Sequence, residues 1–201
     1  MPRNEEPKAA SELSRTLTDP RFLAALCHDL RGPLGAIGTW IHVLGSGRAD
    51  AATQQQALAA MQRDVLAQGR LIEQLADLSS ILAGTLRLTV AEVDLRLLLA
   101  EMGAELRGEV EAPRVLGDLT RLRQLLALLL PAAGDSIRPT LTAKAEEPGA
   151  LWLRGLAPAG ALGLVGLTLA RALAEVQGGQ LATSGTAEGT VFAIQLLAPA
   201  P

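Results

Sequence analysis

The sequence contains few of the residues that build disulfide frameworks, metal centres and aromatic binding platforms. Its 201 residues include one cysteine, Cys27, and two histidines, His28 and His42. One cysteine excludes an internal disulfide and a cysteine-rich zinc site, and two histidines leave little material for a histidine metal site. Aromatic residues make up 2% of the chain, so base-stacking platforms and aromatic ligand cages are not expected.

The sequence also lacks a strong charge bias and a long apolar run. Its formal net charge is −3, which gives no general electrostatic reason to bind nucleic acid. The longest uncharged stretch, residues 155–170, is shorter than the roughly 20 apolar residues that span a bilayer. The N-terminus is polar and of mixed charge, without the apolar core of a signal peptide. We therefore expect a soluble, cytoplasmic protein with no membrane span.

The N-terminal third carries the periodicity of two long helices. Residues 1–18 are expected to form a flexible tail. Apolar residues then recur at spacings of three and four from Leu23 to Leu44, which predicts a helix with Thr18 or Asp19 as N-cap and Pro20 in its first turn. Gly45-Ser46-Gly47 ends this helix. Asp50 caps a second helix, which ends at Gly84.

Two long amphipathic helices joined by a short loop predict an antiparallel hairpin over residues 19–84. Two helices alone cannot bury both apolar stripes. We expect a second copy of the chain to cover them, which gives a four-helix bundle in a homodimer formed through residues 20–84. The alternative is that the hairpin docks onto the C-terminal half of its own chain.

The pattern changes after Gly84 and predicts an α+β fold, with helices on one face of a mainly antiparallel sheet. We expect a linker over residues 85–104 and a second domain over residues 105–201. Arg121 and Arg123 are expected on a solvated face. The predicted strands are residues 86–90, 105–110, 140–145, 151–156, 181–184 and 190–197, and the predicted helices are residues 94–102, 118–130 and 161–177, with residues 147–149 as a turn.

His28 falls on the side of its helix opposite the apolar stripe, so its ring is expected to face solvent. Gly32 and Gly35 lie one and two turns away on the same face. A glycine inside a helix costs about 1 kcal/mol relative to alanine, and Pro33 kinks the helix. These residues favour a surface that is cleared for an approaching partner. A plain surface histidine beside a helix irregularity is the alternative.

Residues 22–44 resemble the phospho-acceptor helix, or H-box, of two-component histidine kinases. The second helix and the linker are similar to those of the same family. The resemblance implies that His28 is phosphorylated on its imidazole and that Asp29 orients the ring and helps to accept a proton. Family members often carry Thr or Asn at the position of Gly32, which supports dephosphorylation of the partner, so phosphatase activity is not expected. The matching residues are Phe22, Cys27, His28, Asp29, Leu30, Arg31, Pro33, Leu34 and Ile37.

The C-terminal half resembles a reduced, degenerate HATPase-like domain. The two positions at which the family has Mg²⁺-binding and phosphate-binding asparagines read Leu128 and Ala132, and apolar side chains cannot ligate Mg²⁺. The segment that begins at Leu153 lacks the aspartate that binds adenine, and the ATP lid is deleted. Of the glycine-rich phosphate loop, Gly166 remains, with Gly163 nearby. We expect the fold of an ATPase domain without its chemistry, and therefore neither a cofactor nor a metal.

Together these features predict a phosphorelay protein of the histidine kinase family that exchanges phosphate between His28 and an aspartate of a response-regulator receiver domain. One alternative is an active sensor kinase that uses ATP and Mg²⁺ in a minimal nucleotide site. Another is a non-catalytic pseudokinase adaptor, and a redox role for Cys27 is a further hypothesis. Whether the chain is an enzyme therefore stays open.

Overall fold

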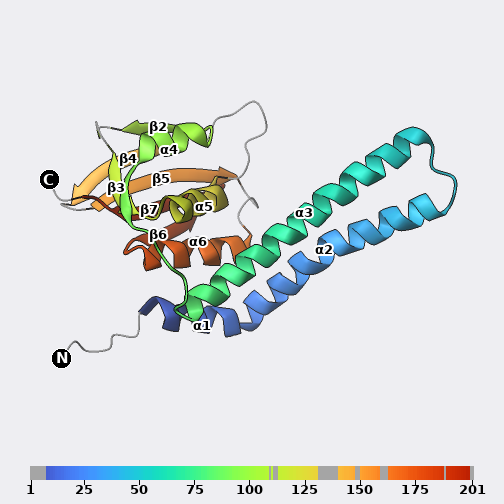
Figure 1. Ribbon diagram of the computed structural model, residues 1–201, viewed down its shortest axis with the longest axis horizontal. Coiled ribbons are helices and arrows are strands. Elements are labelled where there is room, and N and C mark those ends of the chain that lie inside the picture. The colour runs from blue at the N-terminus through green and yellow to red at the C-terminus, as the bar shows by residue number, and fades with distance from the viewer. Residues whose placement is uncertain are drawn as a thin grey trace.

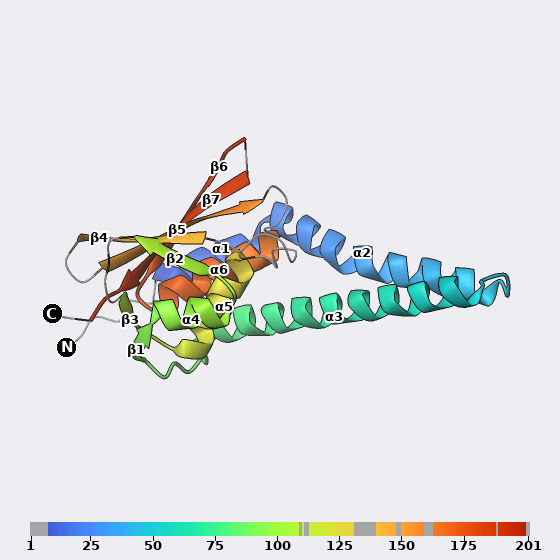
Figure 2. The same cartoon turned by 90° about the horizontal axis from the view of Figure 1, so that it is seen from above.

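A hairpin of two long helices projects from a sheet-containing body in the computed structural model of the chain (Figure 1). The structure describes residues 8–108, 110, 113–130, 140–147, 150–158, 163–187 and 189–199. Seen from above, the far half of the hairpin extends well beyond the body (Figure 2). No helix in these described ranges combines the length and the apolar character that a bilayer-spanning segment requires.

The hairpin consists of α2 (Pro20–Gly45) and α3 (Ala51–Leu82), and both helices begin where the sequence predicts. The Asp19 carboxylate accepts a hydrogen bond from the Arg21 backbone N–H at 2.7 Å, and Asp50 accepts one from the Thr53 N–H at 2.8 Å. Each aspartate thus satisfies a backbone donor that has no partner inside its helix. Gly84 follows α3 with φ +65°, a backbone angle that glycine adopts without steric cost.

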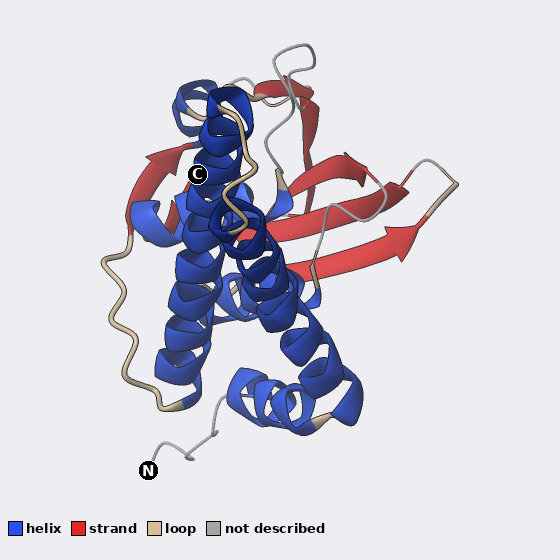
Figure 3. Ribbon diagram, turned by 90° about the vertical axis from the view of Figure 1, so that its right-hand side faces the viewer, coloured by secondary structure: helices blue, strands red, loops and turns tan. Residues whose placement is uncertain are grey.

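An additional helix, α1 (Lys8–Thr18), precedes the hairpin. Its residue Leu13 is buried and Leu17 packs against the same core, and the helix contacts α2, α3 and α6. Figure 3 shows α2 and α3 separating toward the base of the hairpin, where α1 lies across the gap. The expected flexible tail over residues 1–18 is therefore wrong for residues 8–18, while residues 1–7 lie outside the described part. The leucine pair packs on a helix about 150 positions away, and no local signal in the sequence reveals that contact.

The body holds a five-stranded sheet in the order β2-β4-β5-β7-β6. Strands β2 and β4 pair in parallel, and the other neighbours in this sheet pair antiparallel. A separate antiparallel pair joins β1 to β3. The predicted α+β class is thereby confirmed. The elements of the body are β1 (Ala91–Asp94), α4 (Leu95–Glu101), β2 (Glu105–Gly108), β3 (Arg114–Gly117), α5 (Leu119–Leu129), β4 (Thr140–Glu147), β5 (Ala150–Pro158), α6 (Leu164–Val176), β6 (Gln180–Gly185) and β7 (Gly189–Leu197).

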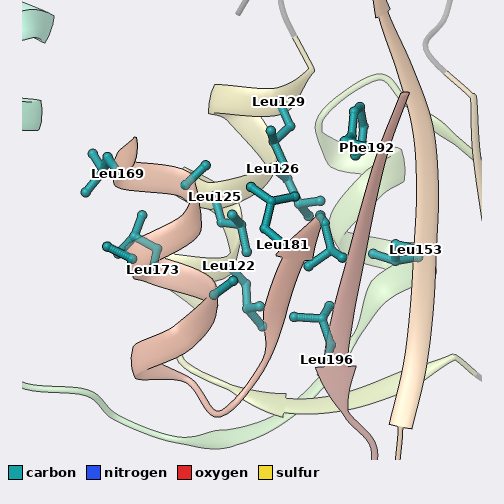
Figure 4. Close-up of a cluster of buried hydrophobic side chains, with 14 of the residues drawn as sticks. Leu122, Leu125, Leu126, Leu129, Leu153, Leu169, Leu173, Leu181, Phe192 and Leu196 are labelled. Atoms are coloured by element: carbon teal, nitrogen blue, oxygen red, sulfur yellow. The ribbon is translucent and has the colours of Figure 1, made fainter. Parts of the chain in front are cut away.

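The core of the body lies between this sheet and helices α5 and α6. Leucines of both helices face Leu153 on β5 and Phe192 and Leu196 on β7 (Figure 4). These side chains are buried, and burying a leucine contributes about 1.5–3 kcal/mol relative to leaving it exposed. The residues that the two helices contribute to this cluster include Leu122, Leu125, Leu126, Leu129, Leu169 and Leu173.

The elements of the body agree with the sequence in part. Residues 86–90 form no strand, and the first strand is β1, which begins at Ala91. Strand β3 was not predicted, because it is four residues long, follows Pro113 and pairs only with β1. The helix predicted over residues 94–102 is confirmed as α4, whose Leu95, Leu98 and Leu99 join the core. Most of the predicted turn at residues 147–149 lies outside the described residues.

Candidate functional site

His28 stands on the third turn of α2 with its side chain 87% exposed. The ring therefore points away from the packed interface between α2 and α3, as the helical wheel predicts. A core histidine would lie in the apolar stripe, so the exposed ring favours a chemical role over a packing role. The second histidine, His42, is exposed near the end of the same helix.

Asp29 contacts the His28 ring, with 3.3 Å between Nδ1 and Oδ1. A proton on Nδ1 makes this contact a hydrogen bond to the carboxylate, near the long end of the usual range. The other ring nitrogen, Nε2, then carries a free lone pair that is directed to solvent. The adjacent carboxylate thus selects the tautomer in which Nε2 is the nucleophile.

An open groove of 380 Å³ runs beside this pair, between α2 and α3. Its walls combine the acceptor pair with one cationic side chain, an amide and several small or apolar residues. The lining residues are His28, Asp29, Gly32 and Pro33 from α2 and Ala67, Arg70, Leu71 and Gln74 from α3.

Pro33 shapes α2 directly after the acceptor pair. Proline has no N–H, so the backbone carbonyl of Asp29 loses its usual partner four residues later. At the same level, Gln68 Nε2 donates a hydrogen bond to the Leu30 carbonyl at 2.6 Å. This bond ties α3 to α2 and fixes which residues of the two antiparallel helices face each other.

Gly32 and Gly35 leave open space on the His28 face of α2. A Cβ atom added to either residue would meet nothing within 4 Å. No contact within the described chain therefore requires glycine here, although glycine weakens the helix. The space is available to a partner, which fits the expectation from the sequence.

The start of α6 lies beside the same groove and brings the body to the acceptor. A Cβ atom on Gly163 would lie 3.9 Å from Asp29 Oδ2, and one on Gly166 would lie 3.8 Å from Gln74 Oε1. These are the two glycines that the sequence marks as remnants of a phosphate loop. The structure thus brings Gly163 next to Asp29 and Gly166 next to Gln74, which sequence spacing alone does not reveal.

A polar cluster joins α3 to α5 below the groove. Arg121 Nη1 donates to Asp77 Oδ1 at 2.9 Å and to Gln124 Oε1 at 2.8 Å, and Gln124 Nε2 donates to Asp77 Oδ2 at 2.6 Å. The side chains of Arg121 and Asp77 are 24% and 20% exposed. The expected solvated face is therefore wrong for Arg121, because its partner on α3 is 44 positions away. We call these three side chains the interdomain clamp.

The comparisons with known proteins agree with this geometry. Residues 21–84 match the family model described as the His Kinase A (phospho-acceptor) domain. Residues 21–84 are therefore similar to the phospho-acceptor domain of histidine kinases. Within this domain His28 and Asp29 occupy the positions that the sequence resemblance marks as acceptor and acidic neighbour.

Two solved structures show that the fold likeness extends over the body. The Acinetobacter baumannii histidine kinase AdeS aligns with a TM-score of 0.63 and 18% identity, over 85% of this chain and 97% of that one. Full-length ShkA in complex with AMPPNP aligns with a TM-score of 0.50 and 22% identity, over 91% of this chain. This chain spans 47% of the ShkA chain. A comparison with curated proteins gives no match. The chain thus joins a segment that matches a His Kinase A domain to an α/β body whose fold is similar to that of these two solved structures.

Among the described residues, positions that the sequence resemblance links to adenine and Mg²⁺ binding lie in apolar surroundings. Leu153, which begins the segment that lacks the family's adenine-binding aspartate, is fully buried in the apolar core. A methyl group on Gly155 would overlap the ring of Phe192 and the Leu141 side chain, so apolar groups fill this part of the sheet surface. Leu128 packs against the core as well, and it offers no oxygen to a hard cation. Ala132 and residues 159–162 lie outside the described part.

Proposed function

We propose that this chain is a phosphorelay protein that carries a phosphoryl group on His28. It exchanges that group with an aspartate of a response-regulator receiver domain and has no ATP-dependent autokinase activity of its own. The observation that carries the proposal is the exposed His28–Asp29 pair beside an open groove. The match of residues 21–84 to a phospho-acceptor domain supports it.

The transfer uses the atoms of this pair. The Nε2 lone pair of His28 attacks the phosphorus of an aspartyl phosphate, the N–P bond forms as the acyl O–P bond breaks, and the aspartate leaves as a carboxylate. The ring gains positive charge, which Asp29 balances through its contact with Nδ1. No separate proton acceptor is required, because the Nδ1 proton stays between the ring and the carboxylate. The reverse direction follows the same path.

Dimerisation belongs to the proposal, because the hairpin leaves an apolar seam uncovered. Five large apolar side chains on it are 58–60% exposed, and their spacing of seven residues on each helix is that of a helix–helix seam. The contacts of α6 with α2 and α3 leave these five residues exposed, so a second copy with the same seam is the matching occupant. The seam residues are Leu34 and Ile41 on α2 and Leu58, Val65 and Ile72 on α3.

The apolar residues of the body favour phosphotransfer over ATP-dependent kinase activity. Losing one charge-assisted contact costs about 1.5–3 kcal/mol. By the resemblance, Leu128 replaces one group that would make such a contact, and the segment that begins at Leu153 lacks another. The interdomain clamp adds to this argument, since two hydrogen bonds to Asp77 hold α5 against the hairpin. The body then acts as a fixed wall beside the acceptor.

A radiolabel experiment separates the proposed function from its alternatives. Receiver domains from the same genome are phosphorylated with labelled acetyl phosphate and mixed with the wild-type chain or with His28→Gln. Label on the wild type and none on the variant supports the proposal. In parallel, labelled ATP with Mg²⁺ is added without a receiver. Label from ATP that depends on His28 would establish the kinase alternative, and no transfer from any receiver would favour the adaptor.

A further inference from the structure

We propose that Arg70 binds the phosphoryl group on His28 and stabilises it during transfer. This inference rests on the proposed function and adds a phosphoryl-binding residue to it. Arg70 lies on α3. In the structure it lines the same groove as His28, from the opposite helix.

The pairing of the two helices places Arg70 level with His28. The hydrogen bond from Gln68 Nε2 to the Leu30 carbonyl fixes the alignment. Because α2 and α3 run antiparallel, the residue two positions after Gln68 lies level with the residue two positions before Leu30. These two residues are Arg70 and His28, and both border the 380 Å³ groove. A group on Nε2 that turns into this groove therefore faces the α3 side.

The charge of Arg70 is not used by any other part of the described chain. Its side chain makes no hydrogen bond or ion pair with another described residue. Among the eight lining residues it is the one with a permanent positive charge, and the one carboxylate, Asp29, contacts His28 instead. An exposed arginine without a partner beside a nucleophile is ready to bind an anion.

The chemistry of the transfer calls for a cation at this place. Phosphorylation of His28 puts a phosphoryl dianion into a groove that already holds the Asp29 carboxylate. A guanidinium presents a rigid fork of N–H donors that matches two phosphoryl oxygens. During transfer the charge is spread over the three oxygens that remain on phosphorus, and a cation aimed at them stabilises this arrangement. Arg70 neither gains nor loses a proton in the step.

A receiver-free measurement tests the contact itself. In a His42→Gln background, so that His28 is the only histidine, the chain is phosphorylated with phosphoramidate, which transfers its phosphoryl group to the imidazole and releases ammonia. ³¹P NMR then follows the titration of the phosphoryl group. With Arg70 present the phosphoryl pKa is expected to be lower than in Arg70→Gln by about 0.5 unit, because the cation favours the dianion. Arg70→Lys retains most of this shift.

Arg63→Gln is the matched control. Arg63 is exposed on the same helix, two turns before Arg70, and does not line the groove. Its removal takes the same charge from α3, and the phosphoryl titration is expected to stay at the wild-type position. An equal shift in Arg63→Gln and Arg70→Gln would reduce the effect to net charge and would overturn the assignment.

Single-turnover transfer from a phosphorylated receiver supplies the second test. At saturating receiver, Arg70→Gln is expected to slow transfer to His28 by roughly 10- to 100-fold, while Arg63→Gln stays within about twofold of wild type. If Arg70→Gln keeps both the wild-type phosphoryl pKa and the wild-type rate of transfer, the proposal is overturned. If no receiver transfers phosphate to the wild-type chain, the proposed function fails, yet the ³¹P titration still decides whether Arg70 binds the phosphoryl group.

Discussion

Replacing Gly32 with alanine should make the protein more stable and its phosphotransfer slower. Gly32 lies inside α2, and a Cβ atom there would meet nothing within 4 Å. Alanine therefore fits without strain and gains the difference in helix propensity, about 0.8–1.0 kcal/mol. For a chain of this size, that gain raises the midpoint of thermal unfolding by about 2–4 °C.

The same methyl group should hinder the partner. Gly32 lines the groove one helical turn from His28, on the face to which a receiver would bring its aspartyl phosphate. A methyl group keeps the two reacting atoms farther apart, and misplacement by about 1 Å can cost 100-fold in rate. We expect transfer to slow by at least about 10-fold, measured as single-turnover transfer from a phosphorylated receiver.

Gly35→Ala is the comparison variant for this prediction. Gly35 also has nothing within 4 Å of an added Cβ, but it does not line the groove. It should give a similar gain in thermal stability and a smaller loss of transfer. If Gly32→Ala is stabilised and still transfers at the wild-type rate, the open space does not serve the partner, and the reasoning from glycine fails.

Three other perturbations test the seam, the interdomain clamp and one capping carboxylate. Val65→Glu places like charges in the apolar seam and should give a folded monomer in analytical ultracentrifugation, whereas a dimer of unchanged affinity would contradict the seam. Asp77→Asn leaves Arg121 half-buried without its counter-ion and should cost about 1–3 kcal/mol, seen as a lower melting temperature and faster amide exchange in α5; unchanged exchange would argue against the clamp. The hydrogen bond from the Thr89 N–H lowers the pKa of Asp118 below its ordinary value of 3.8, so this carboxylate stabilises the fold above that value and the effect is lost as the pH falls through the lowered pKa. Asp118→Asn should therefore flatten the acid limb of the stability–pH curve, and an unaltered limb would count against this account.

Local signals in the sequence predict the hairpin well. Asp19, Asp50 and Gly84 mark helix ends through contacts that involve only their near neighbours, and the helices begin and end close to these residues. The outward direction of His28 follows from the periodicity of a single helix. Features of this kind depend on three to five consecutive residues, which is why one sequence is sufficient to predict them.

Features that depend on distant segments escape such reasoning. Leu13 is buried because α1 packs on α6, and no pattern within residues 8–18 predicts contact with that helix. From the sequence, Arg121 resembles a solvated surface arginine, because only the fold brings Asp77 next to it. Strand β3 exists because β1 lies next to it. Arg70 is one exposed arginine among several, and only the pairing of α2 with α3 brings it level with His28.

Under the proposed function, the body and the hairpin have opposite physical demands. The hairpin needs polar groups in water, and it keeps His28, Asp29 and Arg70 around an open groove. This open groove requires residues in α2 that form helices poorly. The body needs a fixed shape, and apolar side chains at positions such as Leu153 contribute burial energy where nucleotide-binding groups would require solvent and ions. Because the start of α6 lies against Asp29, this rigid body closes one side of the groove. A receiver must then approach from the remaining open side, so the shape of the wall, rather than any nucleotide chemistry, restricts which partners reach His28.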